Sequence, residues 1–282
     1  MLTDTHAHLD FPQFASGLDE IVESANQAGV RRIITIGTSL EGSRRAVALA
    51  DRYPNVWATV GIHPASVETT SIDDLPSLRE LARHPRVVAI GEIGFDYHWL
   101  PSPTARRENT FTEETAESLL AEDVSLQKAQ LQLFHAQMEL AADLGLNVVI
   151  HQRAAWEDTI AALRPHLPRT QSVFHCFTES SVRADELLAL GSLVSFTGIV
   201  TFKNTAPLQQ TVSRIPAGRF MVETDSPYLA PVPHRGKTCE PAYTRLTAEH
   251  IAALRNQPLP DLAAETEATA NSFFWKDGRQ AS

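Results

Sequence analysis

The chain has 282 residues, 43% hydrophobic and 21% charged, a composition typical of a globular protein with a sizeable core. Its formal net charge of −10 argues against a broad basic surface for duplex nucleic acid. No stretch reaches the roughly 18 consecutive apolar residues of a membrane helix, so we expect no membrane association. The two cysteines predict no disulfide framework, and the polar start does not resemble a signal peptide, which together favour the cytoplasm.

Short β-branched runs alternate along the chain with segments whose apolar residues recur at three-and-four spacing. The runs predict eight strands, at Leu2–Thr5, Arg32–Ile36, Val56–Val60, Val87–Ile90, Asn147–Ile150, Gln171–Phe174, Ser192–Phe196 and Arg219–Val222. The spaced segments predict helices, including Leu18–Ala28, Ser43–Arg52, Leu126–Leu144, Trp156–Leu163 and Val182–Leu190. This alternation favours a (β/α)8 TIM barrel of α/β class. A doubly wound sheet is disfavoured, because it needs a glycine-rich phosphate loop after the first strand.

One segment interrupts this rhythm. Residues 101–124 are polar, begin rich in proline, and carry six acidic residues against Arg106 and Arg107. We expect a single domain over residues 1–282 in which this acidic segment is an insertion, either a surface element with a short helix or a partly mobile lid. The end of the chain, from Lys276 to Ser282, is predicted to be a frayed tail.

Histidines and carboxylates follow the predicted strands at the end where barrel active sites are built. A single histidine beside an apolar strand is more often a hydrogen-bonded structural residue, and a single aspartate after a strand is usually a helix cap. Packing alone does not readily place ligand-type side chains at this rim on several different strands. The residues of this set are His6, His8, His63, Glu92, His151, His175 and Asp225.

Four of these histidines and two carboxylates, His6, His8, His151, His175, Glu92 and Asp225, are enough to hold two divalent metal ions, with Mg²⁺, Mn²⁺ and Zn²⁺ all compatible. Glu92, on the middle strand, is the best candidate for a bridging ligand. Asp225 is the candidate proton acceptor for a water activated between the two ions. Four cationic side chains are expected near the rim, namely Arg153, Lys203, Arg235 and Lys237. They are either solvated surface charges or groups that bind a substrate phosphate.

The chain resembles the TatD family of metal-dependent deoxyribonucleases, a group of the amidohydrolase-like metallo-hydrolase barrels. The motifs that carry this resemblance run in order along the chain from residue 1 to about residue 274. They are Asp4-Thr-His-Ala-His-Leu-Asp10, Gly61-Ile-His-Pro64, Gly91-Glu-Ile-Gly-Phe-Asp-Tyr97, Ile150-His-Gln-Arg153, His175-Cys-Phe177, Thr201-Phe-Lys-Asn204, Glu223-Thr-Asp-Ser-Pro-Tyr-Leu229 and Pro231-Val-Pro-His-Arg-Gly-Lys237.

The resemblance implies a role for each matching residue. One metal ion is expected on His6, His8, Glu92 and Asp225, and a second on Glu92, His151 and His175. The substrate side is expected to include His63, Asp96, Arg153, His234 and Arg235. The implied activity is hydrolysis of phosphodiester bonds in single-stranded DNA, as a 3′→5′ exonuclease. No obligate protein partner is evident from the sequence, and we expect a monomer.

Two other functions remain open at this stage. The same site is suited to a D-aminoacyl-tRNA deacylase or another small-molecule metallo-hydrolase, because an activated water attacks a carbonyl as well as a phosphorus centre. A metal-binding scaffold without catalysis is the third possibility. The acidic insertion departs from the family pattern and would repel a polynucleotide unless it folds away or directs Arg106 and Arg107 inward.

Overall fold

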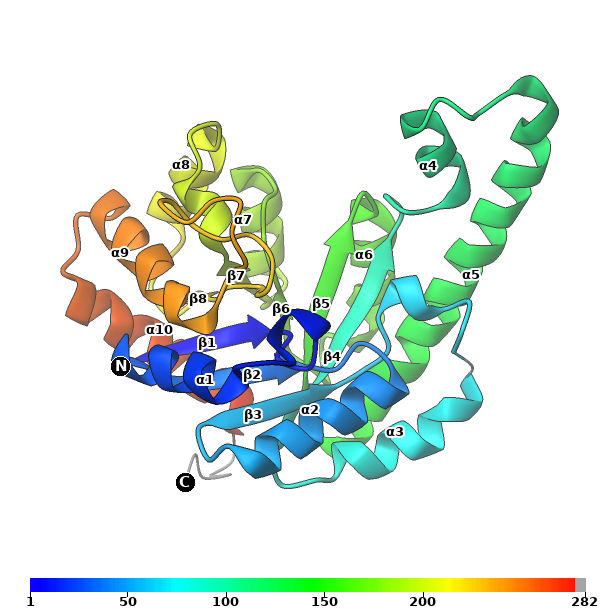
Figure 1. Cartoon of the computed structure of the whole chain (residues 1–282). Coiled ribbons are helices and arrows are strands. Elements are labelled where there is room, and N and C mark those ends of the chain that lie inside the picture. Colours follow the sequence, from blue (N-terminus) through cyan, green and yellow to red (C-terminus); the bar gives the residue numbers. More distant parts are fainter. Residues whose placement is uncertain (71, 277–282) are drawn as a thin grey trace.

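The structure, a computed structural model, describes residues 1–70 and 72–276. Within these residues eight parallel strands form one sheet in chain order, each paired with its neighbour, which confirms the predicted TIM barrel (Figure 1). The strands are β1 Leu2–Ala7, β2 Val30–Ile36, β3 Val56–Val60, β4 Val87–Asp96, β5 Asn147–Arg153, β6 Ser172–Phe174, β7 Leu193–Phe196 and β8 Phe220–Val222. The tail expected beyond Lys276 lies outside the described residues.

The first and last strands meet through a short seam rather than a full ladder. Ala7 forms a parallel bridge with Ser226, just beyond β8, and the backbone N–H of Asp225 donates to the carbonyl of His6 at 2.8 Å. The buried carboxylate of Asp4 accepts hydrogen bonds from the backbone N–H and the hydroxyl of Thr224, at 2.9 and 2.6 Å. The seam that closes the barrel is therefore built by residues beside the predicted ligands.

Ten α-helices are present over the described residues, and most connect successive strands around the outside of the barrel (Figure 1). Their bounds are α1 Leu18–Gln27, α2 Leu40–Arg52, α3 Leu75–Ala82, α4 Pro101–Arg107, α5 Glu113–Leu144, α6 Trp156–Leu163, α7 Ser181–Ala189, α8 Ala206–Arg214, α9 Thr244–Leu254 and α10 Leu259–Phe274. Apolar side chains of strands and helices together form the buried core. None of the described helices combines the length and apolar character needed to cross a membrane.

Three strands continue beyond the predicted ends. β1 runs to Ala7, β4 to Asp96 and β5 to Arg153. In the last two strands, residues 93–96 of β4 pair in register with residues 150–153 of β5. The prediction that Glu92 and His151 follow their strands was wrong, since both lie within them. The extension is not evident in the apolar pattern, because Gly91, Glu92 and Gly94 interrupt the apolar residues of β4 and because β5 ends in His151, Gln152 and Arg153.

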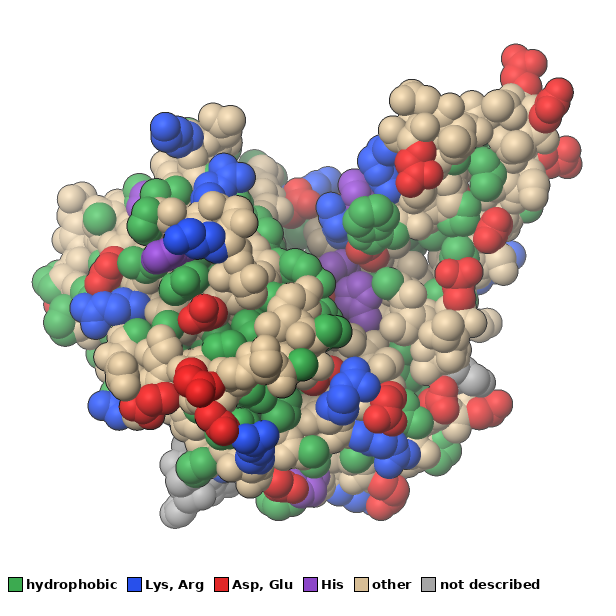
Figure 2. Space-filling model, viewed as in Figure 1, with side chains coloured by type: hydrophobic (Ala, Val, Ile, Leu, Met, Phe, Trp, Pro, Cys, Tyr) green, Lys and Arg blue, Asp and Glu red, His purple; other side chains and the backbone are tan. Residues whose placement is uncertain are grey.

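The acidic segment at residues 101–124 is helical rather than an extended loop. It forms α4 and the first three turns of α5, which therefore begins at Glu113 instead of the predicted Leu126. Thr112 and Thr115 form a reciprocal capping box at this start. Figure 1 shows α4 and the N-terminal half of α5 standing above the barrel opposite α8 and the segment that follows β8. In Figure 2 a hollow lies between these two raised walls, with histidine side chains at its floor.

Candidate metal centre

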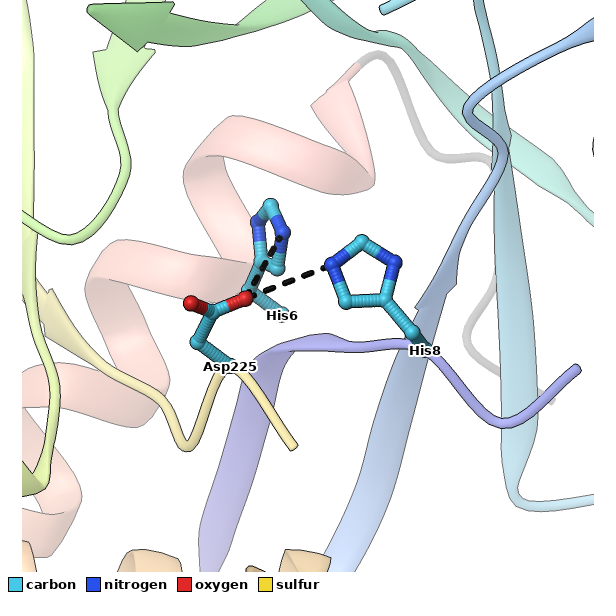
Figure 3. Close-up of side chains that lie close together, drawn as sticks. All are labelled: His6, His8 and Asp225. Carbon is cyan, nitrogen blue, oxygen red and sulfur yellow. Dashed lines mark ion pairs between the residues drawn. The ribbon is translucent and has the colours of Figure 1, made fainter. Parts of the chain in front are cut away.

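The two histidines of the first motif converge with Asp225 at the seam of the barrel (Figure 3). His6 lies in β1 and His8 just after it, and residues two apart on an extended strand point to the same side. Oδ1 of Asp225, which follows β8, lies 3.7 Å from Nε2 of His6 and 3.3 Å from Nε2 of His8. These three side chains form a group that could hold one metal ion.

Glu92 lies between this group and a second one, and its two carboxylate oxygens face different partners. Oε2 lies 3.0 Å from Nε2 of His6 and 3.8 Å from Nε2 of His8. Oε1 lies 2.8 Å from Nδ1 of His151 and 3.2 Å from Nε2 of His175. A carboxylate that presents one oxygen to each of two imidazole groups has the arrangement of a bridging ligand.

His63 is as close to Glu92 as His175 is, with its Nε2 3.2 Å from Oε1. It lies after β3, and together with Glu92 and His151 it forms another group of ligand-type atoms. Its Nδ1 accepts a hydrogen bond from the backbone N–H of Ala65 at 3.0 Å. A neutral His63 therefore carries its proton on Nε2, the nitrogen that faces the site, which is the state of a donor rather than a ligand.

Asp96, expected on the substrate side, contacts the imidazole of His151. Its Oδ2 lies 3.1 Å from Nε2 of His151, while Nδ1 of the same ring faces Glu92. A carboxylate on the far nitrogen fixes the tautomer and orientation of a ligating histidine. The backbone N–H of His98 donates to the other oxygen of Asp96 at 2.9 Å and fixes the carboxylate itself.

Several buried polar atoms of the site have no hydrogen bond of normal geometry within the described residues. They are both ring nitrogens of His6, Nδ1 of His8, Nδ1 of His175 and Oε2 of Glu92. Buried polar atoms almost always have a hydrogen-bond partner. These imidazole nitrogens and this carboxylate oxygen therefore require a partner other than the protein. Imidazole nitrogens and carboxylate oxygens are the usual ligands of divalent metals, and this donor set fits them.

The histidines of the site hold its carboxylates in the ionised form. Burial by itself raises the pKa of Glu92, but His175 and the other nearby imidazoles outweigh it and keep that pKa well below its usual range. Burial likewise raises the pKa of Asp225, and the hydrogen bond from His8 then brings it below its ordinary value. Both carboxylates are therefore available to a cation at neutral pH.

A buried glutamate supports the second group and was not among the predicted site residues. Oε1 of Glu223 accepts the backbone N–H of Cys176 at 2.6 Å and lies 3.7 Å from Nδ1 of His175. Its other oxygen accepts from the hydroxyls of Ser195 and Thr5. Glu223 stands two residues before Asp225 after β8, and this alternation is the sequence signal that could have revealed it.

Glycines allow the strands of the site to approach each other. A Cβ on Gly94 would lie 2.0 Å from the carbonyl oxygen of His151, and its φ of +144° is one that other residues rarely adopt. A Cβ on Gly61 would lie 2.6 Å from the carbonyl carbon of Gly91, next to Glu92. These glycines explain why the motifs around the ligands contain residues without side chains.

The predicted substrate-side residues Arg153, Lys203, His234 and Arg235 lie outside the central cluster, and the predicted cation Lys237 is exposed. The Arg235 guanidinium lies 3.9 Å from the ring centroid of Phe202, the His234 ring stacks on Tyr243 at 4.3 Å, and Lys203 is exposed. Arg153 extends from the end of β5. Within the described residues, no hydrogen bond or ion pair joins these four side chains to the central histidines and carboxylates.

Comparison with known proteins agrees with this geometry. The family model for TatD-related DNases matches residues 3–275. The chain is 35% identical to an uncharacterized metal-dependent hydrolase, YabD, of Bacillus subtilis, over 97% of this chain and 99% of that protein. It is 33% identical to the 3′-5′ ssDNA/RNA exonuclease TatD of Erwinia amylovora, over 96% of this chain and 98% of that one.

A solved structure supports the same conclusion. The crystal structure of YjjV, a TatD homologue from Escherichia coli, superposes with a TM-score of 0.83 at 27% identity and covers 97% of both chains. Family model, relatives and fold all extend over nearly the whole chain, and the site contains the ligand-type residues of a metal centre. The chain therefore belongs to the TatD family of metal-dependent hydrolases.

Proposed function

We propose that the chain is a dinuclear metal-dependent exonuclease that removes nucleotides from the 3′ ends of single-stranded DNA. The observation that carries this proposal is the position of Glu92, whose Oε2 faces His6 while its Oε1 faces His151 and His175. The relative from Erwinia amylovora, named a 3′-5′ ssDNA/RNA exonuclease, supports the choice of nucleic acid.

Each predicted ligand has a place in this proposal. His6, His8, Glu92 and Asp225 would hold one divalent ion, and Glu92, His151 and His175 the other. Such ions, as Mg²⁺, Mn²⁺ or Zn²⁺, neutralise phosphate charge and lower the pKa of a bound water. All the proposed ligands belong to one chain, which supports a monomer as the working unit.

We assign roles in the proton chemistry to two side chains. Asp225 is ionised, and it would accept the proton of the water that attacks the phosphorus. His63 has a lowered pKa, because burial and the neighbouring His151 both disfavour its charged form. With its proton on Nε2, it would donate a hydrogen bond to the leaving 3′ oxygen as the P–O3′ bond breaks, and that oxygen would take its proton from solvent water. The products are a 5′-mononucleotide and a strand one residue shorter that ends in a 3′-hydroxyl.

The test is a time course on single-stranded DNA labelled at either its 5′ or its 3′ end, with Mg²⁺, Mn²⁺ or a chelator. We expect stepwise shortening of the 5′-labelled strand, immediate release of the 3′ label, and no reaction in chelator. Asp225→Asn and Glu92→Ala should abolish the reaction in folded protein. Asp143→Asn, which removes a carboxylate paired with Arg79 on the surface of α5, is the matched control and should keep full activity.

Other outcomes would replace this proposal. Internal cuts would indicate an endonuclease, and hydrolysis of an aminoacyl-tRNA run in parallel without DNA cleavage would indicate a deacylase. Retained activity in both Asp225→Asn and Glu92→Ala would contradict the assigned mechanism. Elemental analysis after metal loading gives a separate check, because fewer than two equivalents per chain would favour a mononuclear enzyme or a scaffold.

A further inference from the structure

Trp99 is an exposed tryptophan between β4 and α4, three residues beyond Asp96. It is 58% exposed, whereas Trp57, Trp156 and Trp275 are 5%, 5% and 8% exposed. A large aromatic ring left in water has no role in the core of the barrel. Exposed aromatic side chains next to a binding site are characteristic of surfaces that stack on ligands.

Cationic side chains surround this ring. The guanidinium carbon of Arg107, in α4, lies 5.1 Å from the ring centroid, and that of Arg153, in β5, lies 5.5 Å from it. Neither guanidinium has a carboxylate within ion-pair distance among the described residues, whereas Arg52, which also lies over an aromatic ring, pairs with Asp19 at 2.7 Å. Nη2 of Arg107 donates to the hydroxyl of Thr104 at 3.0 Å, and the remaining donors of the two guanidinium groups are available for a phosphate.

The pKa of the neighbouring His98 reflects the charges around Trp99. The ring of His98 contacts Trp99 edge-on, with 4.8 Å between centroids. Its pKa is lowered first by partial burial and then by the charges of Arg153 and Arg107. Trp99 thus lies in a small positive region of a protein whose overall charge is negative.

This region is continuous with the metal centre. Arg153 follows His151 by two residues on β5, so both side chains point to the same side about 7 Å apart along the strand. Asp96, which contacts His151, lies in the strand that leads directly to Trp99. Figure 2 shows cationic and hydrophobic side chains on the wall immediately above the histidines at the floor.

Five of the six acidic residues of the helical insertion lie in α5, and the sixth, Glu108, follows Arg107 at the end of α4. Asp123 is buried and accepts hydrogen bonds from the backbone and hydroxyl of Ser102, which fastens α4 onto α5. Glu113, Glu114 and Glu117 are exposed in the first turns of α5. Figure 2 shows several acidic side chains at the far tip and outer side of this wall, and others nearer the hollow. The insertion directs Arg107 toward the ring of Trp99, while Arg106 stacks on Phe111 at 3.7 Å.

We propose that Trp99, Arg107 and Arg153 form a platform on which one unpaired nucleobase stacks, with the adjoining phosphate held by the two guanidinium groups. The proposal rests on the proposed function for its substrate class, and it adds the selection of single strands. A base in a duplex is already stacked and paired, so it cannot reach a flat side chain on a wall without being extruded. Stacking on tryptophan tolerates every base, as an exonuclease requires.

The fluorescence of Trp99 tests the platform directly, because the other three tryptophans are buried. Wild-type protein is titrated with a ten-nucleotide oligothymidylate in chelator at fixed salt, and binding is followed by tryptophan quenching and by anisotropy of a labelled strand. We expect saturable quenching by the oligonucleotide and little quenching by tripolyphosphate, which carries charge without bases. Blunt duplex should also quench little.

Variants separate stacking from charge. Trp99→Ala should lose the quenching and raise the dissociation constant about 5- to 150-fold, the effect of one stacked base. Trp99→Phe should lose the quenching but keep most of the affinity. Arg107→Gln should weaken binding and reduce its salt dependence. The matched control is Arg52→Gln, another guanidinium over an aromatic ring, which should leave binding unchanged.

Hydrolysis distinguishes this inference from the proposed function. If the platform exists, Trp99→Ala raises KM for the strand in the metal-loaded enzyme and leaves kcat nearly unchanged. An enzyme that degrades DNA with the same KM and the same dissociation constant in Trp99→Ala would overturn the platform and leave the exonuclease intact. Saturable quenching without DNA hydrolysis would overturn the exonuclease and leave the platform intact. The absence of both would overturn both.

Discussion

The side-chain amide of Gln130 forms two hydrogen bonds with the backbone of Asp96: its Oε1 accepts from the N–H at 3.0 Å, and its Nε2 donates to the carbonyl at 3.2 Å. Gln137, two helical turns further along α5, does the same with Ile62, the residue before His63, at 2.7 and 3.1 Å. One outer helix thereby fixes two segments of the site, on either side of Glu92.

Replacing Gln130 by leucine should destabilise the protein strongly. The substitution leaves the buried N–H and carbonyl of Asp96 without partners, at a cost of about 1–3 kcal/mol for each group. We expect the free energy of unfolding, measured with urea, to fall by about 2–4 kcal/mol. Gln132→Leu, at an exposed position of the same helix, is the control and should change it by less than about 0.5 kcal/mol. Equal effects of the two variants would contradict this role.

Gly94→Ala should separate β4 from β5. The new Cβ would lie 2.0 Å from the backbone oxygen of His151, and neither strand can move without displacing that imidazole. We expect a loss of more than about 3 kcal/mol of stability or failure to fold. Gly218→Ala, also at positive φ but with no atom within 4 Å of its Cβ, should cost about 1 kcal/mol. Thermal unfolding of both variants makes the comparison.

Removal of single ligands should empty the metal positions separately. His6→Ala removes a nitrogen from the group that contains His8 and Asp225, and should leave about one of two metal equivalents. His151→Ala should remove the other. Metal content by elemental analysis after loading and desalting is the measurement, with thermal unfolding in chelator as a second, since ions that bind only the folded state raise its stability. Loss of both equivalents in His6→Ala would indicate one shared site.

Cys239 should react slowly with alkylating reagents in the folded protein. The side chain is fully buried, and burial, followed by the charges of Asp4 and Asp225, raises the pKa of its thiol. A raised thiol pKa lowers the thiolate fraction, so the native rate should stay low from pH 7 to about 9, whereas the unfolded chain reacts faster as pH approaches about 8.5. Peptide mapping after iodoacetamide treatment measures the modification. Rapid native alkylation at pH 8 would show that the thiol is accessible.

The sequence predicted the barrel because buried parallel strands have a strong apolar pattern and alternate regularly with helices. It did not predict where β4 and β5 end, since Gly91, Glu92 and Gly94 interrupt the apolar residues of β4 and the last three residues of β5 are polar. The first turns of α5 were not predicted as helix because residues 113–125 are mainly polar and lack apolar spacing.

The ligand-type residues were predicted because their side chains alternate along strands that share one rim. The supporting residues were not, for a physical reason. The contacts of Gln130 and Gln137 join a helix to backbone atoms distant in the chain, and nothing in local composition indicates them. Whether His63 is a ligand or a donor depends on one hydrogen bond, from Ala65, that no sequence pattern specifies.

The seam between β1 and β8 also has a consequence for biosynthesis. His6 and Asp225 stand at opposite ends of the chain and meet only when Asp4 and His6 accept hydrogen bonds from residues 224 and 225. A nascent polypeptide still lacking these residues contains the first two histidines without the aspartate that completes their group. The first group of ligand-type side chains can therefore form only after the segment that contains Asp225 has been synthesised and has reached β1.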